Sequence, residues 1–252
     1  MQPAGLFDSL KGHVAQLITT TLPPHKWYTA AYRTASLMAF IRQPKKYHCK
    51  STLAISRAIK LNTLLALLSR QGRAFPIPIH CSKTLDLFTK PRPGGLILCS
   101  THMPLTKLAL NYLVELGFTS PIALAADPGI INSIAIWGTT KKLPAIRTGP
   151  TVLLKAKNIL QQGGTISVMI DNHIGGPYSP NVFHLAEKLN SDIIFADVVL
   201  RDHGQIEVRF EESIWNGQRC VSRVQGQMNE LYQRTNSLLD YYGKSGYLQL
   251  PN

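Results

Sequence analysis

The residue best placed to do chemistry in this sequence is His102. It follows an apolar run, 96–99, whose length and composition predict a buried strand, and it precedes an apolar helix predicted over 105–116. A histidine at the exit of a strand and facing a helix start can act as a general base on an alcohol or an amine. The same position also suits a loop histidine that caps the helix or packs beneath it, so both interpretations stay open.

The residues around His102 resemble a motif of the lysophospholipid acyltransferase superfamily, and within it of the bacterial lipid A late acyltransferases. In that family a Gly-(Val/Leu)-Ile-Leu strand leads into His-x4-Glu or His-x4-Asp, and residues 95–98 and His102 match this pattern. Segment 160–172 is similar to a second family motif, with Asp171-Asn172 where the family has Asp-Gln. The strands predicted over 193–200 and 205–210 resemble a late hairpin of the same fold. The resemblance covers roughly residues 80–240.

The sequence departs from the family motif at Lys107, which stands where the motif has its acid. The resemblance implies that such an acid orients the histidine and stabilises its imidazolium form, whereas a nearby lysine would lower the proton affinity of the histidine. Three interpretations follow. Another carboxylate replaces the missing one, with Asp171 and Asp127 as candidates; or His102 works without one; or the chain is a non-catalytic relative that keeps the fold. We expect Asp171 to be the carboxylate nearest to His102, because both follow predicted strands, and Lys107 to point away.

Basic residues that hold a phosphorylated substrate are also implied by the resemblance, and Lys141, Lys142 and Arg147 lie in the matching region, between a predicted strand and a helix start. Helix N-termini and arginine side chains both bind phosphate, although solvated loop charges explain the pattern as well. Asn172 begins a glycine-rich segment after the strand predicted over 165–170 and is a further candidate for substrate binding. A plain turn is the alternative there.

By this resemblance the protein is expected to be an acyltransferase that moves a fatty acyl group from acyl carrier protein or acyl-coenzyme A to a lipid or other amphiphilic acceptor. His102 would be the general base and Asp171 its partner. The alternative is a catalytically silent relative that binds lipid or a protein partner. We expect no metal or other cofactor, because the sequence has no P-loop or dinucleotide fingerprint and its cysteines lack zinc-site spacing.

The excess of positive over negative charge lies entirely in the first part of the chain. Residues 1–107 contain 15 Lys and Arg against two acids, a net charge of +13, while residues 108–252 contain 12 of each sign. Such a field attracts an anionic membrane surface or an acidic donor such as acyl carrier protein. Nucleic acid would suit the charge too, but no RNA-binding aromatic motif or DNA-reading helix is present, so we do not expect that partner.

Two predicted helices have an apolar face beside basic residues. One face carries Leu6, Leu10, Val14 and Leu17, and the other carries Leu61, Leu64, Leu65 and Leu68. Such helices can lie in a bilayer interface with the apolar face down, or they can cover a sheet. No apolar stretch reaches the ~20 residues that span a bilayer, and no signal peptide is visible. We expect a peripheral protein at the cytoplasmic face of the inner membrane.

The apolar pattern predicts an α/β fold with a mixed central sheet flanked by helices, after an N-terminal helical region. We expect one acyltransferase-like domain over 1–252, in which a basic helical region, 1–75, packs on or precedes a core, 76–252. Prolines exclude 75–78 from a central strand. The predicted strands are 96–101, 121–126, 143–146, 165–170 and a hairpin over 193–210. The predicted helices are 1–22, 26–41, 51–70, 84–88, 105–116, 150–162, 182–189 and 222–242, with an irregular or helical stretch over 129–138.

Overall fold

The computed structural model describes residues 4–41, 50–81, 85–117, 121–125, 133–147, 149–171, 179 and 181–213. Three helices come first: α1 (Ala4–Thr21), α2 (Trp27–Ile41) and α3 (Lys50–Ser69). A 3-10 turn, η1 (Pro24–Lys26), joins α1 to α2, because a proline lacks the N–H that a helix interior needs but fits a first helical turn. The predicted N-terminal helical region is therefore confirmed.

An eight-stranded sheet follows, in the order β1-β8-β7-β2-β6-β3-β5-β4. Its strands are β1 (Ile79–Cys81), β2 (Leu96–Ser100), β3 (Pro121–Ala125), β4 (Ser133–Ala135), β5 (Lys142–Arg147), β6 (Thr165–Met169), β7 (Asp192–Leu200) and β8 (Ile206–Glu212). The central strands β7, β2, β6, β3 and β5 run parallel to one another. Strand β8 is antiparallel to β7, and β4 is antiparallel to β5. The predicted mixed sheet is confirmed.

Helices cover both faces of the sheet. Leu96 and Leu98 of β2 belong to the apolar cluster that contains α5 (Leu108–Glu115) and the N-terminal helices. Ile97 and Cys99 belong to the opposite cluster, with α6 (Val152–Gln161) and α7 (Asn181–Leu189). Because successive side chains of a strand alternate between faces, a strand covered on both sides reads as a continuous apolar run. All five residues of β2 are buried accordingly.

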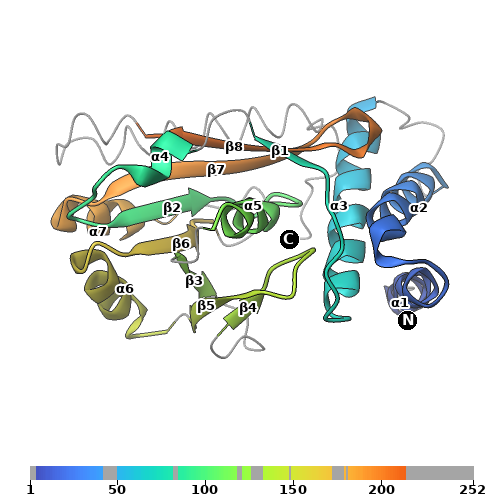
Figure 1. Ribbon diagram of the computed structural model, residues 1–252, viewed down its shortest axis with the longest axis horizontal. Coiled ribbons are helices and arrows are strands. Elements are labelled where there is room, and N and C mark those ends of the chain that lie inside the picture. The colour runs from blue at the N-terminus through green and yellow to red at the C-terminus, as the bar shows by residue number, and fades with distance from the viewer. Residues whose placement is uncertain are drawn as a thin grey trace.

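The N-terminal helices stand at the end of the sheet toward which β2 and β6 run (Figure 1). Helix α2 holds the turn of the β7–β8 hairpin, where the Tyr28 hydroxyl donates a hydrogen bond to the carbonyl of Gly204. A Cβ at Gly204, where φ is +83°, would lie 3.0 Å from the ring of Tyr32. Only glycine therefore adopts this positive φ at position 204 and also leaves room for the Tyr32 ring. One buried apolar cluster includes side chains of α1, α2, α3 and the sheet.

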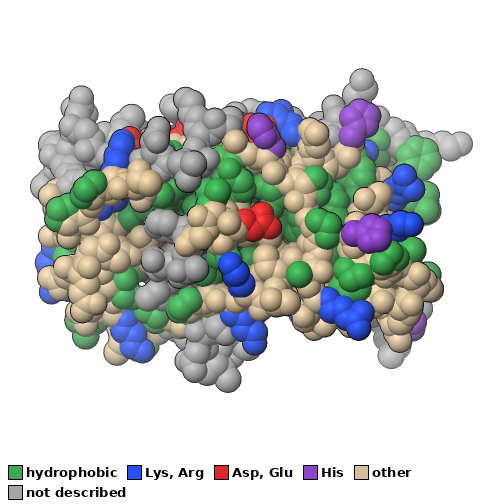
Figure 2. Space-filling model, viewed as in Figure 1, with side chains coloured by type: hydrophobic (Ala, Val, Ile, Leu, Met, Phe, Trp, Pro, Cys, Tyr) green, Lys and Arg blue, Asp and Glu red, His purple; other side chains and the backbone are tan. Residues whose placement is uncertain are grey.

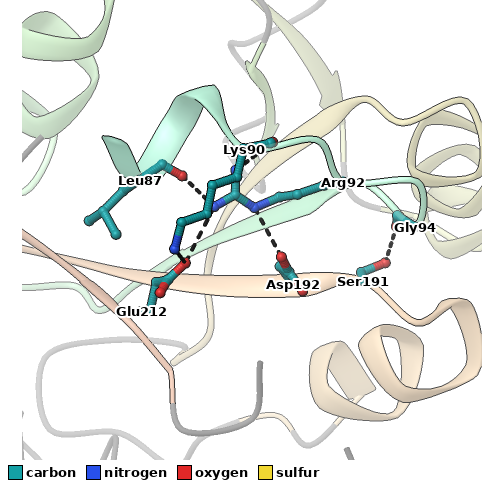
Figure 3. A network of polar contacts seen from close by, with 7 residues as sticks. All are labelled: Leu87, Lys90, Arg92, Gly94, Ser191, Asp192 and Glu212. Atoms are coloured by element: carbon teal, nitrogen blue, oxygen red, sulfur yellow. Dashed lines mark hydrogen bonds and ion pairs between the residues drawn. The ribbon is translucent and has the colours of Figure 1, made fainter. Parts of the chain in front are cut away.

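A polar network fixes the chain just before β2 (Figure 3). The side chain of Arg92 is 5% exposed; its Nε donates to Asp192 Oδ2 at 3.1 Å, and its Nη2 lies 3.6 Å from Glu212 Oε1. Lys90 contacts the same Glu212 oxygen at 2.9 Å. Together these contacts join the turn before β2 to the start of β7 and the end of β8.

Gly95, the glycine of the sequence motif, has a structural role in this turn. Its φ is +74°, and an added Cβ would lie 2.7 Å from the carbonyl oxygen of Gly164 and 2.8 Å from Cα of Leu160. Backbone atoms cannot give way as a flexible side chain can, so a larger residue does not fit. Close packing of β2 against the end of α6 therefore requires this glycine.

Strand β4 lies in a stretch where the sequence predicted no strand. The stretch expected to be irregular or helical, 129–138, contains strand β4, which pairs with β5 through a turn at Gly138; three residues are too few to show the two-residue period of a strand. Segment 126–132 and the predicted last helix, 222–242, lie outside the described residues. As predicted, 75–78 is not a strand, and the short helix α4 (Leu85–Thr89) is present.

Among the described residues, no helix is both long and apolar enough to cross a bilayer.

Candidate active site

Strands β2 and β6 bring His102 and Asp171 side by side. The two strands pair in parallel, with Ser100 opposite Met169 at their carboxyl ends. His102 and Asp171 are each two residues farther along, so they continue the same register. The N–H of Ile170 donates to the Ser100 carbonyl at 3.0 Å, which extends the pairing toward the site. Ligand sites in open α/β sheets lie at this edge, beyond the carboxyl ends of parallel strands.

Asp171 contacts both the backbone and the ring of His102. The His102 N–H donates to Oδ1 at 2.8 Å and to Oδ2 at 3.0 Å, and Nδ1 of the ring lies 2.9 Å from Oδ1. The Asp171 side chain is 1% exposed, whereas that of His102 is 41% exposed. The predicted contact between these residues is confirmed. The carboxylate is enclosed, and the imidazole remains open to a second molecule.

This contact determines which ring nitrogen can act as a base. An ionised carboxylate only accepts hydrogen bonds, so Nδ1 carries a proton and Nε2 holds the free lone pair of the neutral imidazole. The hydrogen bond to Asp171 raises the pKa of His102 above its ordinary value, and the charge of Asp171 adds to this effect. Partial burial and the charge of Lys107 act in the opposite direction. The site therefore holds an oriented imidazole of increased basicity.

Lys107, at the position where the sequence resemblance leads one to expect an acid, does not pair with the histidine. Its Nζ lies over the ring of Trp137, 5.7 Å from the ring centroid, which is within the range of a cation–π contact. The amide of Asn111 donates to the Trp137 carbonyl and holds this tryptophan against α5. The lysine is still close enough for its charge to lower the pKa of His102. Asp171, and not the residue at position 107, is thus the side chain that pairs with the His102 ring.

A residue that the sequence did not indicate holds the far end of the histidine loop. The side-chain oxygen of Asn62, on α3, accepts the N–H of Leu105 at 2.9 Å. Leu105 is completely buried and has a φ of +69°, a left-handed backbone that non-glycine residues rarely adopt. Leaving such a buried N–H without an acceptor costs about 1–3 kcal/mol. In the sequence Asn62 is one polar residue within a leucine-rich helix, which gives no sign of this contact.

The structure separates the predicted phosphate-binding residues. Lys142 begins β5 and Arg147 ends it, and five steps along a strand of about 3.3 Å each place them roughly 17 Å apart. Lys141 is exposed in the turn before β5, and its charge lowers the pKa of Glu115, which burial raises. The backbone positions of Lys142 and Arg147 therefore lie at opposite ends of the strand. Asn172 lies outside the described residues.

Asp127 was the other carboxylate considered as a partner for His102. Asp127 lies outside the described residues. Cys99, three residues before His102, is fully buried in β2, and burial raises the pKa of its thiol, so it is a core residue and not a nucleophile. Within the described part of the chain, no group of three or more His, Cys, Asp or Glu could hold a metal ion.

Comparison of the chain with protein-family models and with curated proteins finds no match.

Proposed function

We propose that the protein is an acyltransferase that moves a fatty acyl group from a carrier thioester to a lipid or other amphiphilic acceptor. In this step Nε2 of His102 takes the proton of an acceptor hydroxyl while the hydroxyl oxygen bonds to the thioester carbonyl carbon. The C–S bond breaks, and the imidazolium returns the proton to the leaving thiolate. The atoms and electrons of this acyl transfer balance without a metal ion, an oxidant or a reductant.

The observation that carries this proposal is the contact between His102 and Asp171. A general base needs a partner that fixes its tautomer and stabilises the imidazolium that forms, and Asp171 meets both needs from a buried position. The resemblance of segments 95–102 and 160–172 to acyltransferase motifs supplies the reaction class. One line of support is geometric, and the other lies in the sequence pattern around the same two residues.

The alternative proposal, a silent relative that binds lipid or protein, was motivated by Lys107. That alternative requires that His102 has no carboxylate partner. Because Asp171 contacts both the backbone and the ring of His102, the lysine at position 107 leaves the histidine oriented. We therefore favour the enzyme over the silent relative.

The proposed donor is acyl carrier protein or acyl-coenzyme A. Acyl carrier protein is acidic, and residues 1–107 carry a net charge of +13 that would attract it. Lys141, Lys142 and Arg147 stay predicted contacts for a phosphate group of the donor or the acceptor. Lys142 and Arg147 stand at opposite ends of β5, so each residue is proposed separately.

We also propose that the protein binds the surface of an anionic membrane, at the cytoplasmic face of the inner membrane. We group the exposed apolar side chains of α1 and α2 under the name α1–α2 apolar surface. It consists of Leu10, Leu17, Leu37, Phe40 and Ile41, which are 47–71% exposed. Figure 2 shows apolar side chains beside basic and histidine side chains at the right of the view, where Figure 1 places the N-terminal helices.

Helix α3 behaves differently from α1, although an apolar face was predicted for both helices. Leu61, Leu64, Leu65 and Leu68 are completely buried, so this helix uses its apolar face to cover the sheet. In α1 it is Ala15 and Ile18 that face the core, and Leu10 and Leu17 point outward. Apolar side chains on a basic surface favour an anionic bilayer over water and over nucleic acid.

The proposed activity can be tested with the purified protein, acyl donor and lipid acceptors of stated composition. The expected result is that radiolabelled acyl chains move from acyl carrier protein or acyl-coenzyme A to an acceptor lipid. Mass spectrometry of lipids from cells with and without the protein would identify the acceptor. Unchanged lipids in those cells, together with no transfer in vitro, would favour the silent relative. Flotation with vesicles beside an electrophoretic shift assay separates lipid binding from nucleic-acid binding.

A further inference from the structure

The loop that carries His102 is held at two points that lie on different parts of the fold. At its start, the backbone and ring of His102 bind Asp171 at the end of β6. Three residues later, Leu105 donates its N–H to Asn62 of α3, a helix of the N-terminal region. The chain makes a tight turn at His102 itself, in which the N–H of Met103 donates to the Thr101 carbonyl at 2.7 Å.

We propose that Asn62 is a positioning residue that keeps the imidazole of His102 on Asp171. Its effect on acyl transfer rests on the proposed function, but its effect on the pKa of His102 does not. The side-chain oxygen of Asn62 fixes the left-handed backbone at Leu105, and that backbone sets the path of residues 102–105. The N-terminal helices would thus contribute to the site through one hydrogen bond.

The hydrogen bonds around Leu105 show why this residue needs an external acceptor. Its carbonyl already accepts the N–H of Leu108 at 2.8 Å, which begins α5. Its N–H points the other way, toward α3, and reaches the oxygen of Asn62. A left-handed conformation at a leucine is unfavourable, so it persists where the surroundings impose it. Without Asn62 the backbone at 105 is free to relax, and the histidine three residues earlier moves with it.

The test measures the pKa of His102 by NMR in the full chain. The resonance of His102 is identified by its loss in His102→Gln. In Asn62→Leu, which keeps the volume but removes the acceptor, we expect this pKa to fall toward the ordinary histidine value, because the hydrogen bond to Asp171 raises it. Asn62→Asp restores an acceptor oxygen at the same place and is expected to return the pKa to the wild-type value or above it.

Thr63→Ala is the matched control. Thr63 follows Asn62 on α3, but its hydroxyl donates to the carbonyl of Ile59 within the same helix. This variant should leave the His102 pKa unchanged. Amide exchange at Leu105 supplies a second readout for the hydrogen bond itself, and we expect faster exchange in Asn62→Leu than in Thr63→Ala. If Asn62→Leu does not fold, Asn62→Ser, with a shorter acceptor, takes its place in the same comparison.

Acyl transfer gives a third readout that separates the two proposals. If Asn62 positions the base, Asn62→Leu should lower kcat by up to about 10²-fold with little change in KM, since a small misplacement of a catalytic group has effects of this size. A lowered pKa of His102 in a protein that transfers no acyl group, even as wild type, would overturn the proposed function and keep the positioning role. A pKa of His102 that is the same in Asn62→Leu, Thr63→Ala and wild type would overturn the positioning role.

Discussion

His102 and Asp171 occupy equivalent places beyond two paired strands. Each stands two residues past the end of its strand, β2 or β6, whose last residues Ser100 and Met169 are opposite one another. Parallel strands in register carry residues of equal offset to the same point at the edge of the sheet. A slip of one residue in β6 would put the buried Ile170 in the place of Asp171. The contact between the histidine and the carboxylate is therefore a direct consequence of the sheet register.

Replacing His102 with alanine should remove most of the acyl-transfer activity and leave the fold intact. General base catalysis contributes about 10²–10⁴-fold to a rate, and the side chain is 41% exposed, so little packing is lost. His184→Ala is the control, because His184 lies on α7 with its side chain 60% exposed. The measurement is the transfer rate, with circular dichroism to verify the fold. Near-full activity in a folded His102→Ala protein would contradict the proposed base.

Asp171→Asn should move the pH dependence of the reaction. A general base works in its neutral form, so the rate rises as the pH passes the pKa of His102, which Asp171 raises. In Asp171→Asn the rise should occur at lower pH, because the charge is gone. The plateau should also be lower, because an asparagine amide can stabilise the wrong tautomer. The measurement is kcat/KM against pH for both proteins, and a midpoint that stays in place or moves upward would argue against the pairing.

Lys107→Glu tests whether the position of the motif acid still matters. Because Nδ1 of His102 is already bound to Asp171, we expect no gain in the acyl-transfer rate from the new carboxylate. We expect the pKa of His102 to rise, since the charge of Lys107 now lowers it. Lys107→Met is the control: it removes the charge and keeps a long side chain near Trp137. A large gain in rate in Lys107→Glu alone would show that the chemistry had decayed at this position.

Binding to anionic vesicles should depend on both salt and the α1–α2 apolar surface. Raising the ionic strength to 1 M shortens the Debye length to about 3 Å and should weaken binding. Phe40→Ser with Ile41→Ser should weaken it at every salt concentration, because burying a large apolar side chain contributes about 1.5–3 kcal/mol. Leu153→Ser with Leu154→Ser is the control, because these two leucines of α6 are also exposed (46% and 59%) and lie outside the α1–α2 apolar surface. Extraction by detergent alone, with no response to salt, would contradict this mode of binding.

The network before β2 should matter for stability and not for chemistry. Arg92→Met leaves Asp192 and Glu212 without their buried partner, and we expect the free energy of unfolding to fall by about 3 kcal/mol. Lys90→Met, which removes a half-exposed partner of Glu212, should cost about 1 kcal/mol or less. Urea unfolding measures both. Equal losses in the two variants would show that burial of the Arg92 guanidinium is unimportant.

Much of this architecture could be predicted from the chain itself. The continuous apolar run 96–99 marks a strand buried on both faces, and the Pro23-Pro24 pair marks the end of the first helix. Alternation of such runs with helical periods identifies an α/β fold, because each pattern shows which side of an element avoids water. His102 and Asp171 were found in the same way, as polar residues that follow apolar strands. The resemblance to acyltransferase motifs selected them from other polar residues of this kind.

Other features were decided by tertiary structure alone. Leucines predicted to lie on an apolar helix face are buried in α3, whereas Leu10 and Leu17 of α1 are exposed, because a helix buries an apolar face only where another element packs against it. The separation of Lys142 from Arg147 follows from the extended strand between them, and the bond from Leu105 to Asn62 joins residues 43 positions apart. A sequence pattern records how each residue interacts with its near neighbours and with water. Which distant residues meet depends on strand order and helix packing, and these are set by the whole chain at once.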